Sequence, residues 1–218
     1  MDQANREVLL AAKTVASYPQ PTMSLPVGTP VIGSMRPVVT RPGRIPASDV
    51  RKLTKWRNRF VDAFLTEFVA TEARTQRFLS ETVDPDEGRI LFMIDDHEGR
   101  TVGQLGLSLI DWETGWGEMD AGIVGEDAAY GLMTQAQETL WRWARDALGL
   151  RGVIGRIRSD NSVVDYAKEK AGAAELMRVP LRRETVDDGI HWIEDTSLTS
   201  PELSLVYLEI QSVEHGST

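Results

Sequence analysis

The chain has 218 residues and a hydrophobic content of 41%, enough for one sizeable core, so we expect one folded domain. Its 24 Lys and Arg against 33 Asp and Glu give a formal charge of -9, which disfavours nucleic acid and anionic membrane surfaces as partners. The lack of cysteine excludes disulfides, thiolate metal sites and cysteine nucleophiles. Since no apolar run has the length of a signal or membrane-spanning segment, we expect a cytoplasmic protein.

Residues 1–45 are rich in proline and show little periodicity, which is typical of an arm. Within this segment, Thr29–Ile32 and Met35–Thr40 predict short strands at sheet edges, because glycine and proline lie in and around them. We therefore expect an N-terminal arm over 1–45, suited to packing on a neighbouring subunit in a homo-oligomer, and a folded domain over 46–218.

In the domain, helical segments alternate with β-prone segments, and this pattern predicts an α+β fold. Apolar residues at helical spacing indicate a helix after Ser48, and Thr71 is a cap for a second helix. A longer helix is expected from about Tyr130 to Leu148, where Gly149 stops it. The remaining predictions are antiparallel strands at 90–94, 102–110 and 119–124, a strand at 153–157, a helix at 161–171, and β-prone segments at 176–181, 190–193 and 203–210.

Several short motifs follow one another in a recognisable order. They are Trp56-Arg57-Asn58, Phe92–Arg100 with Val102-Gly103, Gly117-Glu118-Met119, Gly131–Ala136, and Ser159-Asp160-Asn161 before Glu169–Gly172. In this order the chain, from Trp56 to about Trp192, resembles the GNAT superfamily of acyl-CoA-dependent N-acyltransferases. The resemblance implies a mainly antiparallel central sheet that splays in its middle, flanked by helices, with acetyl-CoA as co-substrate. The Trp-Arg-Asn element is most similar to the branch with ribosomal-protein N-terminal and amino-sugar-nucleotide acetyltransferases.

A strand that splays from its neighbour leaves backbone groups free to pair with the amides of a pantetheine arm, and 121–124 is the expected strand. The loop after it leads into a helix whose free N–H groups suit a pyrophosphate, with Gly131 allowing close approach. The family's loop usually opens with Gln or Arg, but this chain has Ala128 there, so binding rests on backbone donors and Tyr130. The alternative is that the glycines of this loop bind no cofactor and only cap and turn an ordinary strand–loop–helix connection. The predicted cofactor-binding residues are Ala121, Ile123, Val124, Tyr130, Gly131, Leu132 and, as the resemblance implies, Asn161.

Acetyl transfer to an amine needs a group that accepts the amine proton, and a carboxylate near the splayed strand is suited to this task. Glu118 is the first candidate for this base. Asp120 shares its face of the strand, and two neighbouring carboxylates raise the pKa of one of them. Asp111 and Glu113 are weaker candidates. The alternative is that Glu118 and Asp120 form only a solvated strand face.

A hydroxyl beside the departing thiolate would protonate it. In the family, a tyrosine often stands seven residues after the asparagine that opens the next helix, and counting from Asn161 leads to Lys168. Tyr166 lies two residues earlier, about 200° away around a helix, so it is a catalytic candidate only with a shift in register. Asn161 itself is either a pantetheine contact or simply a helix cap.

Trp56, Arg57 and Asn58 are the candidate substrate-binding residues, with a core position and helix bracing as their alternative roles. The three histidines show no metal spacing, so we expect no metal site. The predicted function is acetyl transfer to the primary amine of a small acceptor, and the Trp-Arg-Asn element favours an amino-sugar nucleotide. A protein N-terminus is the nearest rival. A non-catalytic acyl-CoA-binding or assembly module on the same fold is the alternative from another class.

Overall fold

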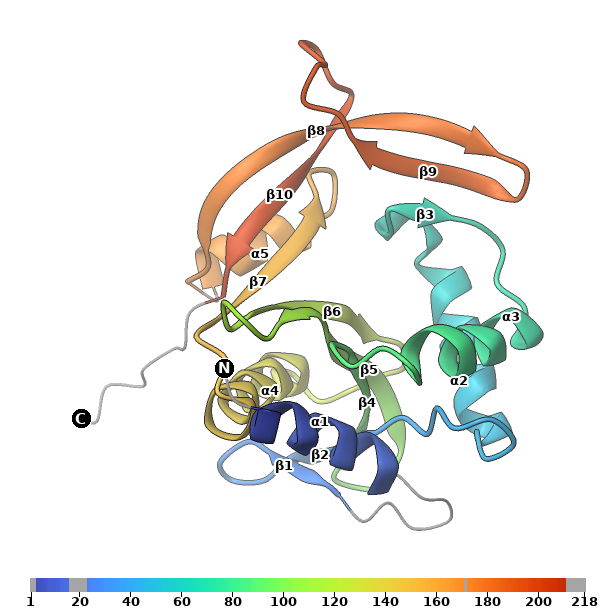
Figure 1. Ribbon diagram of the computed structural model, residues 1–218, viewed down its shortest axis with the longest axis vertical. Helices are drawn as coiled ribbons and strands as arrows, with labels where there is room; N and C mark the ends of the chain where they lie inside the picture. Colours follow the sequence, from blue (N-terminus) through green and yellow to red (C-terminus); the bar gives the residue numbers. More distant parts are fainter. Residues whose placement is uncertain (1–2, 16–22, 171, 211–218) are drawn as a thin grey trace.

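The computed structural model describes residues 3–15, 23–170 and 172–210, and its ten strands form one sheet (Figure 1). The strands are β1 (Leu25–Val27), β2 (Gly33–Pro37), β3 (Thr66–Glu67), β4 (Ile90–Asp96), β5 (Thr101–Asp111), β6 (Trp116–Val124), β7 (Gly152–Arg158), β8 (Ala174–Val186), β9 (Gly189–Glu194) and β10 (Leu203–Glu209). The helices are α1 (Gln3–Val15), α2 (Ala47–Arg59), the 3-10 turn η1 (Val61–Ala63), α3 (Glu72–Arg77), the π-helix η2 (Phe78–Val83), α4 (Leu132–Leu148) and α5 (Val163–Lys170).

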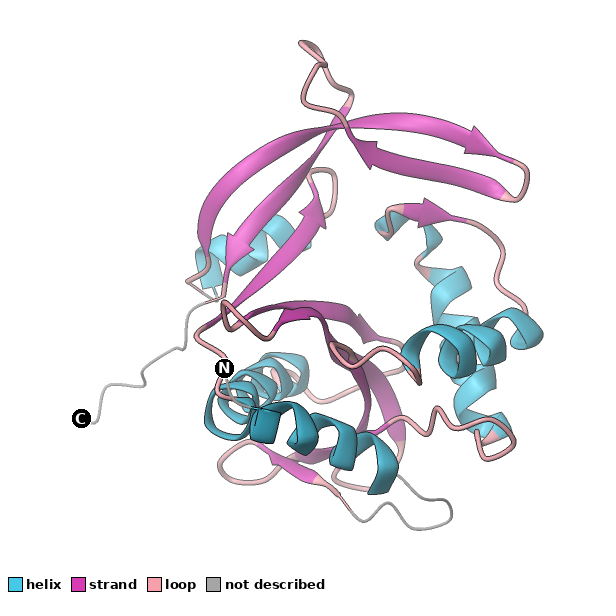
Figure 2. Ribbon diagram, in the orientation of Figure 1, coloured by secondary structure: helices cyan, strands magenta, loops and turns pink. Residues whose placement is uncertain are grey.

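The sheet runs in the order β1-β2-β4-β5-β6-β7-β10-β8-β9-β3. Among the described strands, β6 and β7 form the one parallel pair, and all other neighbours are antiparallel. Helices lie on both sides of the sheet (Figure 2). The predicted α+β class with a mainly antiparallel sheet is therefore confirmed.

The described part of the N-terminal segment belongs to this sheet and its core. Helix α1 buries Leu9 completely in the core that α4 covers, and β2 pairs with β4. The Lys13 ammonium donates to three backbone carbonyls of the 83–86 loop at 2.6 to 2.8 Å. Leu9, Ala12, Val27 and Met35 of this segment are buried within the same chain. Packing of the segment on a neighbouring subunit stays a prediction. The predicted strand at 29–32 is instead the turn between β1 and β2.

Two apolar cores lie on opposite faces of the central strands. One packs beneath α1 and α4, where the predicted helix stripe is fully buried, and the other packs beneath α2 and η2. Gly149 ends α4 with a φ of 66°, a left-handed conformation that favours glycine, as the sequence predicted. The members of the α4 stripe are Leu132, Ala136, Leu140, Ala144 and Leu148.

The sheet splits between its two parallel strands. The pairing of β6 with β7 covers only 116–118 and 152–154, although β6 continues to Val124 and β7 continues to Arg158. A bulge accompanies the split, since three steps along β6 from Asp120 to Ile123 face two steps along β5. Ala121 lies within this bulge with a φ of 55°. The predicted splay in the middle of the sheet is confirmed, and the split leaves one edge of β6 without a strand partner.

Beyond the split, the C-terminal strands arch back towards the helical side of the molecule. Figure 1 shows the long, curved β8 and its partner β9 reaching β3, which the α2–α3 connection carries. Strand β9 pairs with β3 over two residues, so the C-terminal strands meet the segment between α2 and α3 at this point, and β3 is the edge strand of the sheet. No helix in the described ranges is long and apolar enough to cross a membrane.

Candidate active site

Glu118 and Asp120 project from β6 where it leaves β7. Met119, which lies between them in the strand, packs against the core beneath α4, and Gly117, which precedes Glu118, contacts the same core. Because side chains alternate along a strand, the two carboxylates face the opposite side, towards α2. The side chain of Glu118 is 10% exposed and that of Asp120 is 29% exposed. The structure therefore brings both predicted carboxylates to one face of the split strand.

Glu118 has a partly buried cationic partner that the sequence alone did not identify. Arg156 Nε on β7 donates to Glu118 Oε2 at 2.7 Å, and its Nη1 donates to Glu194 at 3.4 Å. Tyr207 donates its hydroxyl to the same Glu194 carboxylate at 2.8 Å. The pKa of Glu118 is raised, chiefly by burial and in addition by the nearby Asp120 carboxylate, while Arg156 acts to lower it. A raised pKa suits a carboxylate that must take up a proton near neutral pH.

Asp120 stands beside a second partly buried arginine. Arg89 Nη1 lies 3.6 Å from Asp120 Oδ2, and Arg89 Nε lies 3.3 Å from Asp86 Oδ2. Asp111 serves another purpose, because its carboxylate accepts the backbone N–H of Glu113 and the hydroxyl of Thr114, both at 2.8 Å, and so closes the β5–β6 turn. These turn contacts occupy the Asp111 carboxylate, so Glu118 stays the first candidate for the base.

The bulged end of β6 has the geometry expected for a pantetheine site. Gln104 donates its side-chain amide to the carbonyl of Ala121 at 3.1 Å, which fixes the left-handed residue in the bulge. Ile123 is buried against the α2 side and Val124 is exposed. From Met119 onward, the β7 side of this strand lacks a ladder partner among the described strands. Its backbone is thus available for an amide-containing ligand.

The start of α4 is open and uncapped. Gly131 precedes the helix with a φ of 82°, and a Cβ placed there would meet no atom within 4 Å. No described side chain caps the helix, its first turn holds no acidic residue, and Tyr130 is fully exposed beside it. The Glu126 carboxylate, which would repel a phosphate, is occupied by Lys55 at 2.7 Å and by Trp56 Nε1 at 3.2 Å. These observations fit a pyrophosphate held by backbone N–H groups.

The segment around α5 contains the other residues predicted from the resemblance. Asn161 accepts the backbone N–H of Val163 at 3.0 Å, which is a helix-cap contact. The Tyr166 hydroxyl lies 2.8 Å from the hydroxyl of Thr134, in the first turn of α4. Lys168 forms an ion pair with Glu175 at 2.8 Å. Tyr166 is therefore placed beside the predicted pyrophosphate helix, and its role as an acid stays a prediction.

We expect Tyr166→Phe to lower kcat by less than about tenfold, because the variant loses one partly exposed hydrogen bond. Steady-state kinetics with saturating acetyl-CoA measure this effect, and Thr134→Val is the matched variant that removes the other hydroxyl of the same pair. A loss of several hundredfold in Tyr166→Phe alone would instead assign the tyrosine to proton transfer.

The structure shows contacts within the protein for Trp56, Arg57 and Asn58, and their assignment to acceptor binding stays a prediction. Trp56 is completely buried, and a Cβ at Gly125 would come within 2.1 Å of its ring, so the indole packs beneath the cofactor loop. Arg57 donates to the backbone and hydroxyl of Thr66 and stacks on phenylalanine rings. The Asn58 amide donates to and accepts from the backbone of Ala70. All three side chains brace the protein itself, which was the alternative interpretation.

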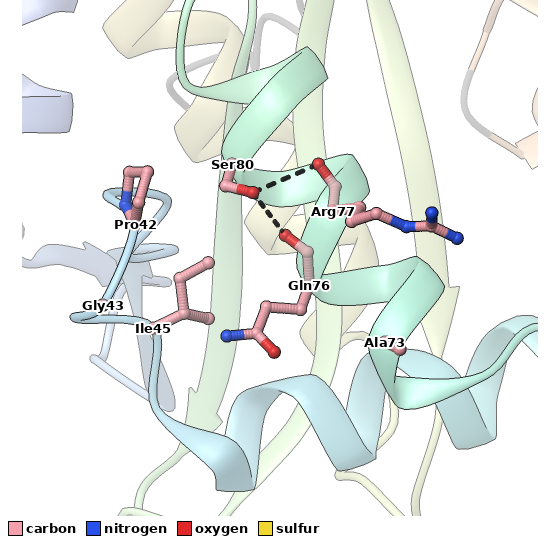
Figure 3. A pocket seen from close by; sticks show the side chains of 7 residues that line it. All are labelled: Pro42, Gly43, Ile45, Ala73, Gln76, Arg77 and Ser80. Carbon is pink, nitrogen blue, oxygen red and sulfur yellow. Dashed lines mark hydrogen bonds between the residues drawn. The ribbon is translucent and has the colours of Figure 1, made fainter.

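A shallow groove of about 500 Å³ lies away from the split strand, between the loop before α2 and the helices α3 and η2 (Figure 3). Ser80 donates its hydroxyl to the carbonyls of Gln76 and Arg77 on its own helix, at 2.9 and 3.3 Å. The groove does not include Glu118 or Asp120. Its lining residues are Pro42, Gly43, Ile45, Ala73, Gln76, Arg77 and Ser80. We therefore place the chemistry at the split and not in this groove.

The acetyltransferase (GNAT) domain family matches residues 44–174, more than half of the chain. The chain belongs to the GNAT acetyltransferase family. No curated protein matches the chain. Similar solved structures include a spermidine N-acetyltransferase from Vibrio cholerae in complex with CoA and spermine, with a TM-score of 0.59, 12% identity, and coverage of 81% of this chain and 94% of that chain. A GCN5-related N-acetyltransferase from Brucella melitensis has a TM-score of 0.58 and 15% identity, covering 89% of this chain and 85% of that chain.

Membership of the GNAT family makes the protein an N-acetyltransferase that uses acetyl-CoA. The structural likenesses, at such low identity, show the shared fold. The open edge of β6 and the uncapped start of α4 are the features of this chain that fit the co-substrate.

Proposed function

We propose that this GNAT enzyme acetylates a primary amine of a small, positively charged acceptor, with Glu118 as the base. The observation that supports the proposal most is the position of Glu118, which is buried at the mouth of the split with Arg156 at 2.7 Å. In the reaction, the amine nitrogen forms a bond to the acetyl carbon, and the bond from that carbon to the CoA sulfur breaks. The amine proton passes to Glu118, directly or through water, and the thiolate departs.

Charge around the split favours a cationic acceptor. Around Glu118, the carboxylates of Asp120 and Glu194 add to its own, and the guanidinium groups of Arg89 and Arg156 oppose them. These three carboxylates and two guanidinium groups carry one excess negative charge when all are ionised. A protonated amine entering this field is attracted, whereas a diphosphate is repelled.

The acceptor therefore differs from the one that the sequence favoured. An amino-sugar nucleotide was expected from Trp56-Arg57-Asn58, but those side chains brace the protein, and the net charge of the split opposes a diphosphate. Spermine, the amine named with the similar Vibrio structure, is a polycation and supports testing that chemistry first.

An acceptor panel tests the proposal by following release of the CoA thiol from acetyl-CoA. We expect kcat/KM for a polyamine such as spermidine to exceed that for an amino-sugar nucleotide by about tenfold or more, which corresponds to about 1.4 kcal/mol. Turnover restricted to peptides with a free N-terminus would favour the rival acceptor. Binding of acetyl-CoA without turnover of any amine would contradict the enzymatic proposal and favour the non-catalytic acyl-CoA-binding module.

A further inference from the structure

Arg158 is almost completely buried at the end of β7, on the open side of the split. Its Nε and Nη2 donate to the two oxygens of Asp160 at 3.1 and 2.7 Å, and its Nη1 donates to Glu67 at 2.5 Å. Nη1 also reaches the carbonyl of Phe64 at 3.2 Å. The guanidinium lies 5.0 Å from the ring centre of Trp192 on β9. One side chain of β7 thus contacts the segments that carry β3 and β9.

These contacts surround the point where β9 meets β3, which we call the β3–β9 seam (Thr66–Glu67 with Ile190–His191). Trp192 donates its indole N–H to Glu67 at 2.7 Å and its backbone N–H to Leu65 at 2.8 Å. A Cβ at Gly189 would come within 1.9 Å of the Glu67 carbonyl, so the close approach requires glycine. The seam pairs only two residues of each strand, so its stability depends on these side-chain contacts.

The seam is held from the helical side as well. Arg57 binds Thr66 and Asn58 binds Ala70, so α2 fixes both ends of the segment that carries β3. At the β8–β9 turn, directly beside the seam, Asp188 forms an ion pair with Arg74 of α3 at 2.5 Å. The strands beyond the split are therefore tied to the same helices that cover the face of Glu118.

Direct contacts connect the seam to the proposed base. Trp192 shares an apolar cluster with Leu181, Leu205 and the ring of Tyr207. The Tyr207 hydroxyl binds Glu194, which Arg156 links to Glu118. The β8–β9 hairpin is thus connected by direct contacts to Glu118.

We propose that Arg158 is a positioning residue for the acceptor, because it stabilises the β3–β9 seam and so holds the β8–β9 hairpin in place beside Glu118. This inference rests on the proposed function, in which Glu118 takes up the proton of the amine. The predicted cofactor contacts on 121–124 and at the start of α4 lie outside the seam, whereas Asn161 follows Asp160 and donates its backbone N–H to the Arg158 carbonyl at 3.0 Å. Opening the seam at Gly189, which leaves Arg158, Asp160 and Asn161 unchanged, should therefore affect the two substrates differently.

Two variants open the seam by independent routes. Arg158→Met removes the guanidinium, and Gly189→Ala introduces a methyl group against the Glu67 carbonyl. The control is Gly155→Ala on β7, where a Cβ would make only an ordinary contact at 3.6 Å. Arg158→Lys should fail to restore the wild-type behaviour, since an ammonium cannot span Glu67 and Asp160 as the planar guanidinium does.

The measurements are KM for the best amine of the panel, kcat, the dissociation constant for acetyl-CoA by calorimetry, and hydrogen exchange of the Trp192 amide. For Arg158→Met and Gly189→Ala we expect the amine KM to rise about tenfold and the amide to exchange at least about tenfold faster. Acetyl-CoA affinity should change by less than about twofold in Gly189→Ala, which leaves Asp160 and Asn161 in place. Faster exchange with an unchanged amine KM, or a parallel loss of acetyl-CoA affinity in Gly189→Ala, would overturn the inference. A wild-type enzyme that turns over no amine would instead refute the proposed function, and exchange would still show whether Arg158 holds the seam.

Discussion

Glu118→Gln is expected to lower kcat by about two to four orders of magnitude, the usual contribution of a positioned general base. The amide keeps the shape of the side chain and a carbonyl oxygen for Arg156 Nε, which Glu118 now binds at 2.7 Å, but it cannot accept the amine proton. Steady-state kinetics at saturating acetyl-CoA and amine provide the test. Acetyl-CoA affinity, measured by calorimetry, should stay within about threefold of the wild type, because Glu118 lies outside the predicted cofactor contacts.

The pH dependence of the reaction gives a second test of Glu118. Only the ionised carboxylate accepts a proton, and burial raises its pKa, so kcat/KM should fall as the pH drops through that raised pKa. Because Asp120 contributes to the rise, Asp120→Asn should move the acidic limb of the profile to lower pH. Arg156→Met removes the cation that lowers the pKa and should move the limb to higher pH.

The control for these variants is Glu202→Gln in an exposed loop, which should leave the profile unchanged. A Glu118→Gln enzyme with more than about a tenth of the wild-type kcat would contradict the assignment of the base. The solvated-face interpretation of Glu118 and Asp120 would then be preferred, since such a face contributes little to catalysis.

Gly131→Trp is expected to weaken acetyl-CoA binding by about a hundredfold or more. The glycine lies at the open N-terminus of α4 with free space around its Cβ direction, so an indole would occupy the volume proposed for the pyrophosphate. A hundredfold loss corresponds to about 2.7 kcal/mol of binding free energy. Isothermal calorimetry with acetyl-CoA measures it without requiring an amine.

The chain offers a matched control in Gly99, at the β4–β5 turn. Gly99 has a φ of 77° against 82° for Gly131, and a Cβ there also meets no atom within 4 Å. Both tryptophan variants therefore carry a similar backbone strain of about 1–2 kcal/mol, but only one lies at the cofactor helix. Equal loss of acetyl-CoA affinity in Gly99→Trp and Gly131→Trp would show that strain, and not obstruction, causes the effect.

Much of this architecture was predictable from local patterns. The spacing of apolar residues along 130–148 predicts α4 and its buried stripe, and Gly149 predicts its end. The polar and glycine turns between 90 and 124 predict the three-stranded meander, and Glu118 was identifiable from its place at the start of the open strand. These features depend on residues within a few positions of one another, so the chain itself reveals them.

Contacts between distant residues were decided by the tertiary structure. Glu118 meets Arg156 across 38 positions, Arg158 meets Glu67 across 91, and Trp192 meets Glu67 across 125. The alternation in Arg156-Ile157-Arg158 shows that both arginines share a face, but only strand register shows which carboxylates they meet.

By itself, the sequence determined the α+β class, the order of the longer elements from α2 to β10, the family resemblance and the carboxylates of β6, but not α1, β1 or β3. The tertiary structure decided that Trp56 is buried, that Ala121 forms a bulge, that the described N-terminal strands join the sheet, and that β9 closes onto β3. The physical reason is that periodicity and turn chemistry act over a few residues, whereas burial and ion pairing depend on how strands far apart in the chain are aligned.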